Sequence, residues 1–260
     1  MEVHHHSHTA RKKWTHYFWE FLMLFLAVTL GFFVENWREH IIENRRAAEL
    51  ARSLYHELQR DSANLKEVQS SRLKRENCIQ YLIQFIQDSN LTNPSNEFCV
   101  CMVEGLTSFV PATFEPRDAI LVQLKSSGML RYFKDPLFQD GLTELSFAIS
   151  SVRTRSERER NYFFEYINPF LLQHLDQNWI GQIIGNREIT VDSSIIEYRK
   201  NNRVYPCQFK HPDSIKKEEA TDMLTYYYRM IIRHTRLSVY HSYETINHEM
   251  QMHLRSKYNL

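Results

Sequence analysis

The segment from Phe21 to Val34 constrains the fold most, because it contains no charged residue and its apolar side chains go all the way round a helix. Aromatic residues of the kind found at membrane interfaces flank it: Trp14, Tyr17, Phe18, Trp19 and Trp37. A helix from Tyr17 to Trp37 is about 30 Å long, which matches the hydrocarbon core of a bilayer. We therefore predict a transmembrane anchor over residues 14–37, after a mobile, His-rich basic tail over residues 1–13.

Glu20 lies at the start of this apolar segment and does not exclude insertion. The ten Leu, Phe and Val residues of the segment contribute roughly −3 to −6 kcal/mol, which one carboxylate near the end of a span does not cancel. We predict an interfacial position for Glu20, together with Trp14, Tyr17, Trp19 and Trp37. A proton- or ion-pathway role is the alternative, and an oligomer would favour it because several copies of Glu20 could form a ring.

The basic residues Arg11, Lys12 and Lys13 before the span resemble those of a signal sequence, but no small-x-small cleavage site follows Val34. An uncleaved signal anchor is the better interpretation. Cationic residues lie on both sides of the span, yet a long domain weighs less than a short tail in the positive-inside rule. The pattern favours a cytoplasmic N-terminus and an exported C-terminal domain.

Residues 35–88 contain neither proline nor glycine and predict one long helix that continues from the anchor. Apolar residues recur in it at seven-residue spacing, interrupted by Asp61, Arg72 and Arg75. The two series are Ala51, Leu58, Leu65, Ile79 and Ile86, and Ala47, Leu54, Val68 and Leu82. We expect this stripe to pack against later helices of the same chain, and a self-associating stalk is the alternative.

The remaining chain predicts more helices, separated by loops near 89–115 and 185–212. Alternation in CVCMVEGL, residues 99–106, predicts a short extended piece, and a helix is expected to begin at Pro116 and to end at a left-handed Gly128.

Asp135 is the expected N-cap of a further helix, which Pro169 should end or kink, and the final helix is expected over residues 212–258. The predicted fold class is therefore all-α. A transmembrane helix continues into a long helix that packs in an antiparallel bundle, and residues 38–260 form a soluble helical domain.

Composition narrows the functional classes. A net charge of +1 gives no reason to expect nucleic acid as a partner, and six scattered glycines cannot build a phosphate-binding loop, so we expect no cofactor. Neither GxSxG nor HExxH occurs, and we assign no catalytic residue. The four cysteines, Cys78, Cys99, Cys101 and Cys207, allow a disulfide in an exported domain, and buried free thiols are an equal alternative.

One set of metal-ligand candidates lies on the last helix. His234, His241 and His248 recur every seven residues, and Glu244 is one turn from the last two. A metal would need His241, Glu244 and His248 to converge, usually with a partner helix completing the shell, so a polar helix face is the favoured interpretation. The neighbouring tyrosines Tyr226, Tyr227 and Tyr228 should supply core and surface, and one could line a ligand pocket.

Three segments together carry a resemblance: FWEFLMLFLAVTLGFFVEN, LYHELQRDSANL and LKSSGMLRYFKDPLFQDGL. With them, the chain resembles uncharacterised single-pass membrane proteins of Bacteroidota over most of its length. The resemblance implies a membrane anchor plus a helical domain, and it implies no activity, substrate or site. With the orientation favoured by the charge pattern, the anchor would lie in the bacterial inner membrane and the helical domain in the periplasm.

These observations lead to a functional hypothesis with two alternatives. The leading one is a membrane-anchored helical interaction or sensor-like module, not an enzyme, whose partners are the lipid bilayer and an unknown protein or small ligand. The first alternative is an oligomeric channel-like or scaffold assembly of this chain, suggested by Glu20 and the heptad pattern. A metal-dependent enzyme using the last helix is the least favoured.

Overall fold

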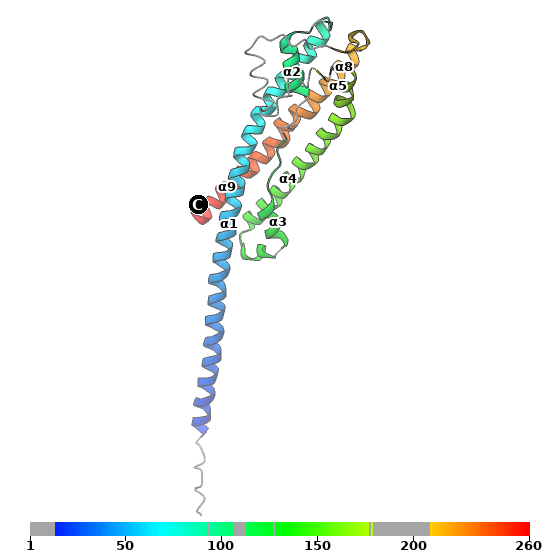
Figure 1. Cartoon of the computed structure of the whole chain (residues 1–260). Helices are drawn as coiled ribbons and strands as arrows, with labels where there is room; N and C mark the ends of the chain where they lie inside the picture. The colour runs from blue at the N-terminus through cyan, green and yellow to red at the C-terminus, as the bar shows by residue number, and fades with distance from the viewer. Residues whose placement is uncertain (1–13, 93, 107–112, 127, 177, 179–208) are drawn as a thin grey trace, which may run out of the picture. The chain divides into compact units, whose positions relative to one another are not determined.

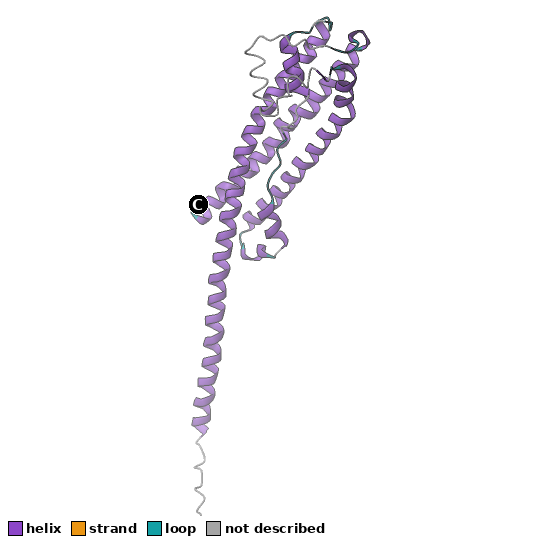
Figure 2. Cartoon of the chain, viewed as in Figure 1, coloured by secondary structure: helices purple, strands orange, loops and turns teal. Residues whose placement is uncertain are grey.

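The computed structural model describes residues 14–92, 94–106, 113–126, 128–176, 178 and 209–260. Helices make up nearly all of these ranges, and the described part contains one isolated antiparallel bridge, between Leu175 and Phe209, but no strand (Figure 2). The prediction of an all-α fold is confirmed. The chain divides into two compact units, residues 1–50 (unit 1) and residues 51–260 (unit 2).

Helix α1 (Trp14–Asp88) runs without a break from unit 1 into unit 2 (Figure 1). Within unit 1 its apolar segment is long and apolar enough to cross a membrane, and none of this segment is buried. Phe32, for example, is 74% exposed. The predicted anchor over residues 14–37 is therefore a candidate membrane span by length and composition.

The part of α1 in unit 2 buries the predicted heptad stripe. Its buried members are Ala51, Leu54, Leu58, Leu65, Ile79, Leu82 and Ile86. The partners of this stripe belong to the same chain, so the expected packing of the long helix against later helices is confirmed. A self-associating stalk would need this apolar surface to be free, and the fold already uses it.

Unit 2 is built on α1, on α4 (Pro136–Tyr162) and on a last helical run from α8 (Lys217–Tyr226) to α9 (His241–Tyr258). Cross-helix hydrogen bonds define the directions of these helices. Lys217 Nζ donates to Ser89 O at 2.7 Å, whereas Ser62 Oγ lies 3.2 Å from Asn247 Oδ1, so the last run is antiparallel to α1.

The last run is also antiparallel to α4 (Figure 1). Tyr162 Oη, at the end of α4, donates to Met223 O at 3.0 Å, and His253 Nε2 lies 2.8 Å from Asp135 Oδ2 at its start. The bundle is thus antiparallel, as predicted, and α1 and α4 run in the same direction within it.

The prediction of an extended piece at CVCMVEGL is wrong, because these residues belong to helix α2 (Asn96–Leu106). This helix lies inside the region expected to be a loop, residues 89–115. Ser95 Oγ accepts a hydrogen bond from Phe98 N at 3.1 Å, which satisfies a free amide of the first turn. Nearly the whole circumference of α2 is buried: Phe98, Cys99, Val100, Cys101, Met102, Val103, Gly105 and Leu106. A helix buried on all sides loses its polar stripe, so its residues resembled a strand pattern.

Helix α3 (Ala119–Ser126) begins three residues after Pro116, the predicted start. The reason is tertiary: Arg117 N donates to the buried Asp61 Oδ2 at 2.9 Å, which holds this stretch outside the helix. Gly128 has φ +67°, the predicted left-handed conformation, and precedes the short 3-10 helix η1 (Met129–Tyr132). The predicted N-cap of α4 is confirmed, since Asp135 Oδ1 accepts from Leu137 N at 3.1 Å.

Pro169 does not end its helix. The π-helix η2 (Phe163–Ile167) follows α4 directly, and α5 (Asn168–His174) carries Pro169 in its first turn. Proline lacks an amide donor, and the altered hydrogen-bond pattern of the preceding π turn lets the helical run continue through Pro169.

The final helix begins at Lys217 rather than at 212, because η3 (Pro212–Ser214) is a separate 3-10 turn. The loop predicted over 185–212 lies outside the described residues except for its last part, which includes this turn.

Candidate anion-binding pocket

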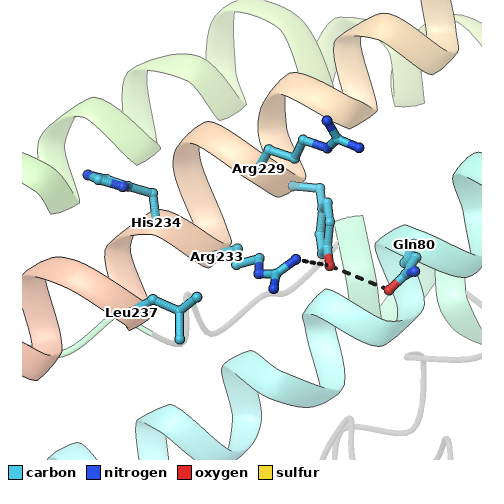
Figure 3. Close-up of a pocket in the computed structure, with 6 residues that line it drawn as sticks. Gln80, Arg229, Arg233, His234 and Leu237 are labelled. Atoms are coloured by element: carbon cyan, nitrogen blue, oxygen red, sulfur yellow. Dashed lines mark hydrogen bonds between the residues drawn. The ribbon is translucent and has the colours of Figure 1, made fainter.

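A solvent-facing pocket of about 400 Å³ lies between α1 and the last helical run of unit 2 (Figure 3). Its lining consists of Gln80, Tyr228, Arg229, Arg233, His234 and Leu237. Tyr228 is half-buried and the other five side chains are exposed. Among the described residues, the pocket wall therefore carries two guanidinium groups and an imidazole, but no carboxylate.

The helical wall of this pocket is π-helix rather than α-helix. Two π stretches, η4 (Tyr227–Arg233) and η5 (Thr235–Tyr240), connect α8 to α9. π-Helical turns are rare and are found frequently at functional sites, because the widened turn moves side chains out of the α-helical register. Arg229 and Arg233 belong to η4, and His234 lies between the two π stretches.

Side chains from the two neighbouring helices hold the π stretches in place. Arg72 Nη2 of α1 donates to Ile232 O at 3.1 Å, and Arg155 Nη2 of α4 donates to Met230 O. Thr235 Oγ1 donates to Ile231 O at 2.6 Å and accepts from Arg155 Nε at 3.0 Å. Three successive carbonyls, at positions 230, 231 and 232, thus receive side-chain hydrogen bonds, as widened turns require.

Behind the pocket wall lies a buried ionic cluster of Arg72, Arg75, Glu159 and Tyr227. Arg72 Nη2 is 2.8 Å from Glu159 Oε2, and Arg75 Nη1 is 3.3 Å from Glu159 Oε1. Arg75 Nη2 also donates to Tyr227 Oη at 2.6 Å. Burial raises the pKa of Tyr227 to about 12, so the hydroxyl stays neutral and accepts this bond. The Glu159 carboxylate thus accepts hydrogen bonds from both guanidiniums.

Inside the pocket, Tyr228 connects the two walls. Arg233 Nη1 donates to Tyr228 Oη at 3.3 Å, and Tyr228 Oη donates to Gln80 Oε1 at 3.4 Å. Figure 3 shows the Arg233 side chain pointing across the gap toward Gln80. The Arg233 guanidinium also lies 5.9 Å from the centre of the Tyr228 ring. These contacts hold the Arg233 guanidinium in place before a ligand binds. Arg229, about one helical turn earlier in η4, supplies a second cation.

This arrangement suits an anion with a small apolar part. Guanidinium groups bind carboxylates and phosphates through paired N–H donors, and an imidazole adds a further donor. Leu237 and the Tyr228 ring supply apolar surface beside the charges. The volume is in the range of small-molecule sites, about 300–1,000 Å³.

The predicted interface residues all lie on α1 in unit 1 and are exposed: Trp14, Tyr17, Trp19, Glu20 and Trp37. His16 Nε2 lies 3.1 Å from Glu20 Oε1, one turn apart as the sequence spacing indicates.

The metal candidates His241, Glu244 and His248 are exposed on α9. Glu244 Oε2 accepts a hydrogen bond from Gln69 Nε2 of α1 at 3.3 Å. Within the described ranges, no group of three or more His, Cys, Asp and Glu side chains is arranged to hold a metal ion. The structure therefore does not bring these three residues together.

The sequence indicated part of the pocket. His234 was one of the regularly spaced histidines, and Tyr228 was one of the tyrosines expected to supply surface or line a pocket. Nothing in the sequence marked Arg229 or Arg233 as a binding residue, because single arginines on a charged helix usually belong to a solvated face.

No family model, curated protein or solved structure matches this chain.

Proposed function

We propose that this chain is a non-catalytic, membrane-anchored helical module whose unit 2 binds a small organic anion in the pocket of Arg229, Arg233 and His234. The observation that carries the proposal is the composition of the pocket wall, which combines two guanidiniums and an imidazole with no carboxylate. Such a wall attracts an anion.

The apolar segment of unit 1 supports the membrane part of the proposal. Its large side chains are exposed, including Leu24 at 69% and Phe33 at 67%. A contiguous apolar surface of this kind is unfavourable in water and favourable in hydrocarbon. Residues 14–37 would form a single-pass anchor in a bacterial inner membrane, with the lipid bilayer as its partner.

The cysteines support an orientation with the N-terminus in the cytoplasm and unit 2 in the periplasm. Cys99 is disulfide-bonded, and disulfides persist in oxidising compartments but are rare in the cytosol. The proposed ligand would then be a periplasmic anion, and its binding to unit 2 would serve a sensor-like or interaction role.

The membrane anchor is tested on the full-length chain. Alkaline carbonate should leave the protein in the membrane pellet, and an alkaline phosphatase fusion at the C-terminus should be active if unit 2 is periplasmic. Release by carbonate would overturn the anchor. An inactive phosphatase fusion, with an active cytoplasmic reporter at the same position, would reverse the orientation.

The pocket is tested by titration calorimetry of the full-length protein in detergent, with phenyl phosphate and benzoate as probes. Benzyl alcohol is the uncharged control. We expect saturable binding of at least one anion and none of the alcohol. Arg233→Gln should weaken binding about tenfold or more, since a hydrogen bond to a charged group contributes about 1.5–3 kcal/mol.

A matched control variant is Arg255→Gln, which removes an exposed cation from α9 outside the pocket. It should bind the probes like the unmodified chain. Equal affinities of the Arg233→Gln and Arg255→Gln variants would show that the pocket is not the binding site.

A further inference from the structure

Two buried thiols face each other between α1 and α2, away from the pocket. Cys78 belongs to α1 and Cys101 to α2, and neither is in a disulfide. Their Sγ atoms are 2.7 Å apart. A disulfide bond has an S–S length of about 2.05 Å, so the two sulfur atoms are only slightly farther apart than in a bonded pair.

The backbones, rather than flexible side chains, bring these sulfur atoms together. A Cβ added at Gly105 of α2 would lie 3.3 Å from Cys78 Cβ and 3.3 Å from Ile79 Cγ1 of α1. Arg75 Nε donates to Gly105 O at 2.9 Å, which fixes α2 against α1 at the same level. The close approach of the thiols is therefore built into the helix packing.

The surroundings favour a structural bond over a reactive dithiol. Cys78 Sγ donates to Glu104 Oε2 at 3.4 Å, and Cys101 Sγ lies 3.8 Å from Glu97 Oε1. The hydrogen bond with Cys101, burial and the nearby Glu104 carboxylate together raise the pKa of Cys78 well above its usual range. A thiol of this kind is a poor nucleophile and a poor leaving group, so a disulfide here would exchange slowly once formed.

We propose that Cys78 and Cys101 form a structural disulfide that links α1 to α2, in addition to the disulfide at Cys99. The oxidant is a second disulfide, such as oxidised glutathione. When local opening exposes the pair, one cysteine thiolate attacks the glutathione disulfide and releases one glutathione, and the other thiolate displaces the second. The two cysteines lose two protons and two electrons, the Sγ–Sγ bond forms, and the glutathione disulfide is reduced to two thiols.

The test uses the full-length chain with Cys99→Ser and Cys207→Ser, so that Cys78 and Cys101 are the only cysteines. The protein in detergent is equilibrated with a glutathione buffer rich in the oxidised form, denatured, and alkylated with N-ethylmaleimide without reduction. We expect no maleimide adduct, and two adducts after dithiothreitol. Two adducts before reduction, or two bound glutathiones, would overturn the proposal. Because the buffer supplies the oxidant, the result does not depend on membrane orientation.

If the two-cysteine variant does not fold, the pairing can still be mapped on the unmodified chain by peptide analysis. Trypsin leaves both cysteines in one peptide, residues 76–117, whereas cleavage after Glu76, Glu97 and Glu104 separates Cys78 from Cys101. We expect peptides 77–97 and 98–104 to be joined, with fragmentation placing the link at Cys101. A link from Cys78 to Cys99 or to Cys207 would contradict the proposed pairing.

Stability gives an independent readout in the same two-cysteine variant. Cys78 and Cys101 are 23 positions apart, and closing a loop of this size should raise Tm by roughly 6–12 °C for a domain of this length. Dithiothreitol should lower Tm by that amount, and adding Cys78→Ser should abolish the effect of the reductant. An unchanged Tm on reduction would count against a bond that stabilises the packed helices.

Discussion

At the scale of single residues, Asp61, Arg72 and Arg75 show why charges interrupt the heptad stripe of α1. Each is buried and meets a partner from elsewhere in unit 2. Asp61 accepts hydrogen bonds from Arg117 Nη1 at 2.7 Å and from Tyr243 Oη at 2.8 Å. Arg72 and Arg75 both contact Glu159. A buried charge is tolerated only when it is paired and hydrogen-bonded, so these positions specify which helices meet α1 and in which register.

Glu159→Gln tests this role. The variant removes the carboxylate charge that both Arg72 and Arg75 contact, and breaking such a buried cluster costs about 3–5 kcal/mol of unfolding free energy. Denaturant unfolding measures the loss. Glu157→Gln, at an exposed position of the same helix, is the control and should stay within about 0.5 kcal/mol of the unmodified protein. Equal stabilities of the two variants would contradict the importance of the cluster.

Asp135 gives a pH-dependent prediction. The hydrogen bond from Lys257 Nζ at 2.7 Å, and then that from His253, lower the pKa of Asp135 from 3.8 to about 2. A carboxyl whose pKa is lower in the folded state stabilises the fold above its unfolded pKa, and this contribution disappears as the pH falls toward the folded pKa.

We therefore expect the stability difference between the unmodified chain and Asp135→Asn to be full above about pH 4 and to shrink between pH 4 and pH 2. The urea midpoint, followed against pH, measures it. Asp140→Asn changes an exposed carboxylate of the same helix and should show no such convergence. A difference independent of pH would assign the effect to the helix cap alone.

At the scale of elements, α2 and the π stretches depart from what local sequence indicates. α2 is a helix buried on almost every side, so neither an amphipathic stripe nor an exposed face marks it. The π stretches η4 and η5 keep helical dihedrals at their caps and differ from α-helix in hydrogen-bond pattern. Their widened turns are held by Arg72 and Arg155 from other helices, which local propensity does not report.

The packing of α2 against α1 makes Gly105 sensitive to substitution. Alanine favours a helix over glycine by about 1 kcal/mol, but a Cβ at position 105 would lie 3.3 Å from both Cys78 and Ile79. We expect Gly105→Ala to destabilise by about 1–2 kcal/mol net, because the crowding involves two packed helices.

Gly141→Ala is the matched comparison within α4. There the added Cβ would meet the flexible end of Met250, which can move aside. This variant should be neutral or more stable by up to about 1 kcal/mol. Thermal unfolding compares the two, and a more stable Gly105→Ala would show that α1 and α2 are not closely packed there.

At the scale of the whole molecule, the two units have opposite surface chemistry. Unit 1 leaves most of its apolar side chains exposed, whereas unit 2 encloses an apolar core and buries charges in pairs. The heptad stripe of α1 is buried inside unit 2, which removes one of the two reasons to expect an oligomeric channel-like or scaffold assembly.

Lysines in the middle of the span should abolish insertion. Each lysine at a helix centre costs about 2.5–3.5 kcal/mol on an insertion scale, and the apolar residues contribute roughly −3 to −6 kcal/mol. Leu26→Lys with Val28→Lys should therefore prevent membrane integration, measured as carbonate-resistant protein. Glu20→Gln, near the end of the span, should remain integrated. Carbonate-resistant attachment of the double-lysine variant would place the attachment elsewhere in the chain.

The sequence alone determined the features that depend on local pattern. The uncharged apolar segment of α1 predicted its exposed candidate span, and the seven-residue spacing from Ala51 to Ile86 predicted the buried face. Asp135 and Gly128 predicted a cap and a left-handed turn, because side-chain chemistry and φ preference act within a few residues.

Only the tertiary structure decided what depends on distant partners. It placed Arg117 beside Asp61, set Glu159 between two arginines, and brought Arg233 and Gln80 together at one pocket. Opposite charges and complementary donors make these contacts favourable only once helices far apart in the chain are packed side by side. The spacing of residues along one segment carries no record of such a partner, so the pocket and its buried support emerged with the fold.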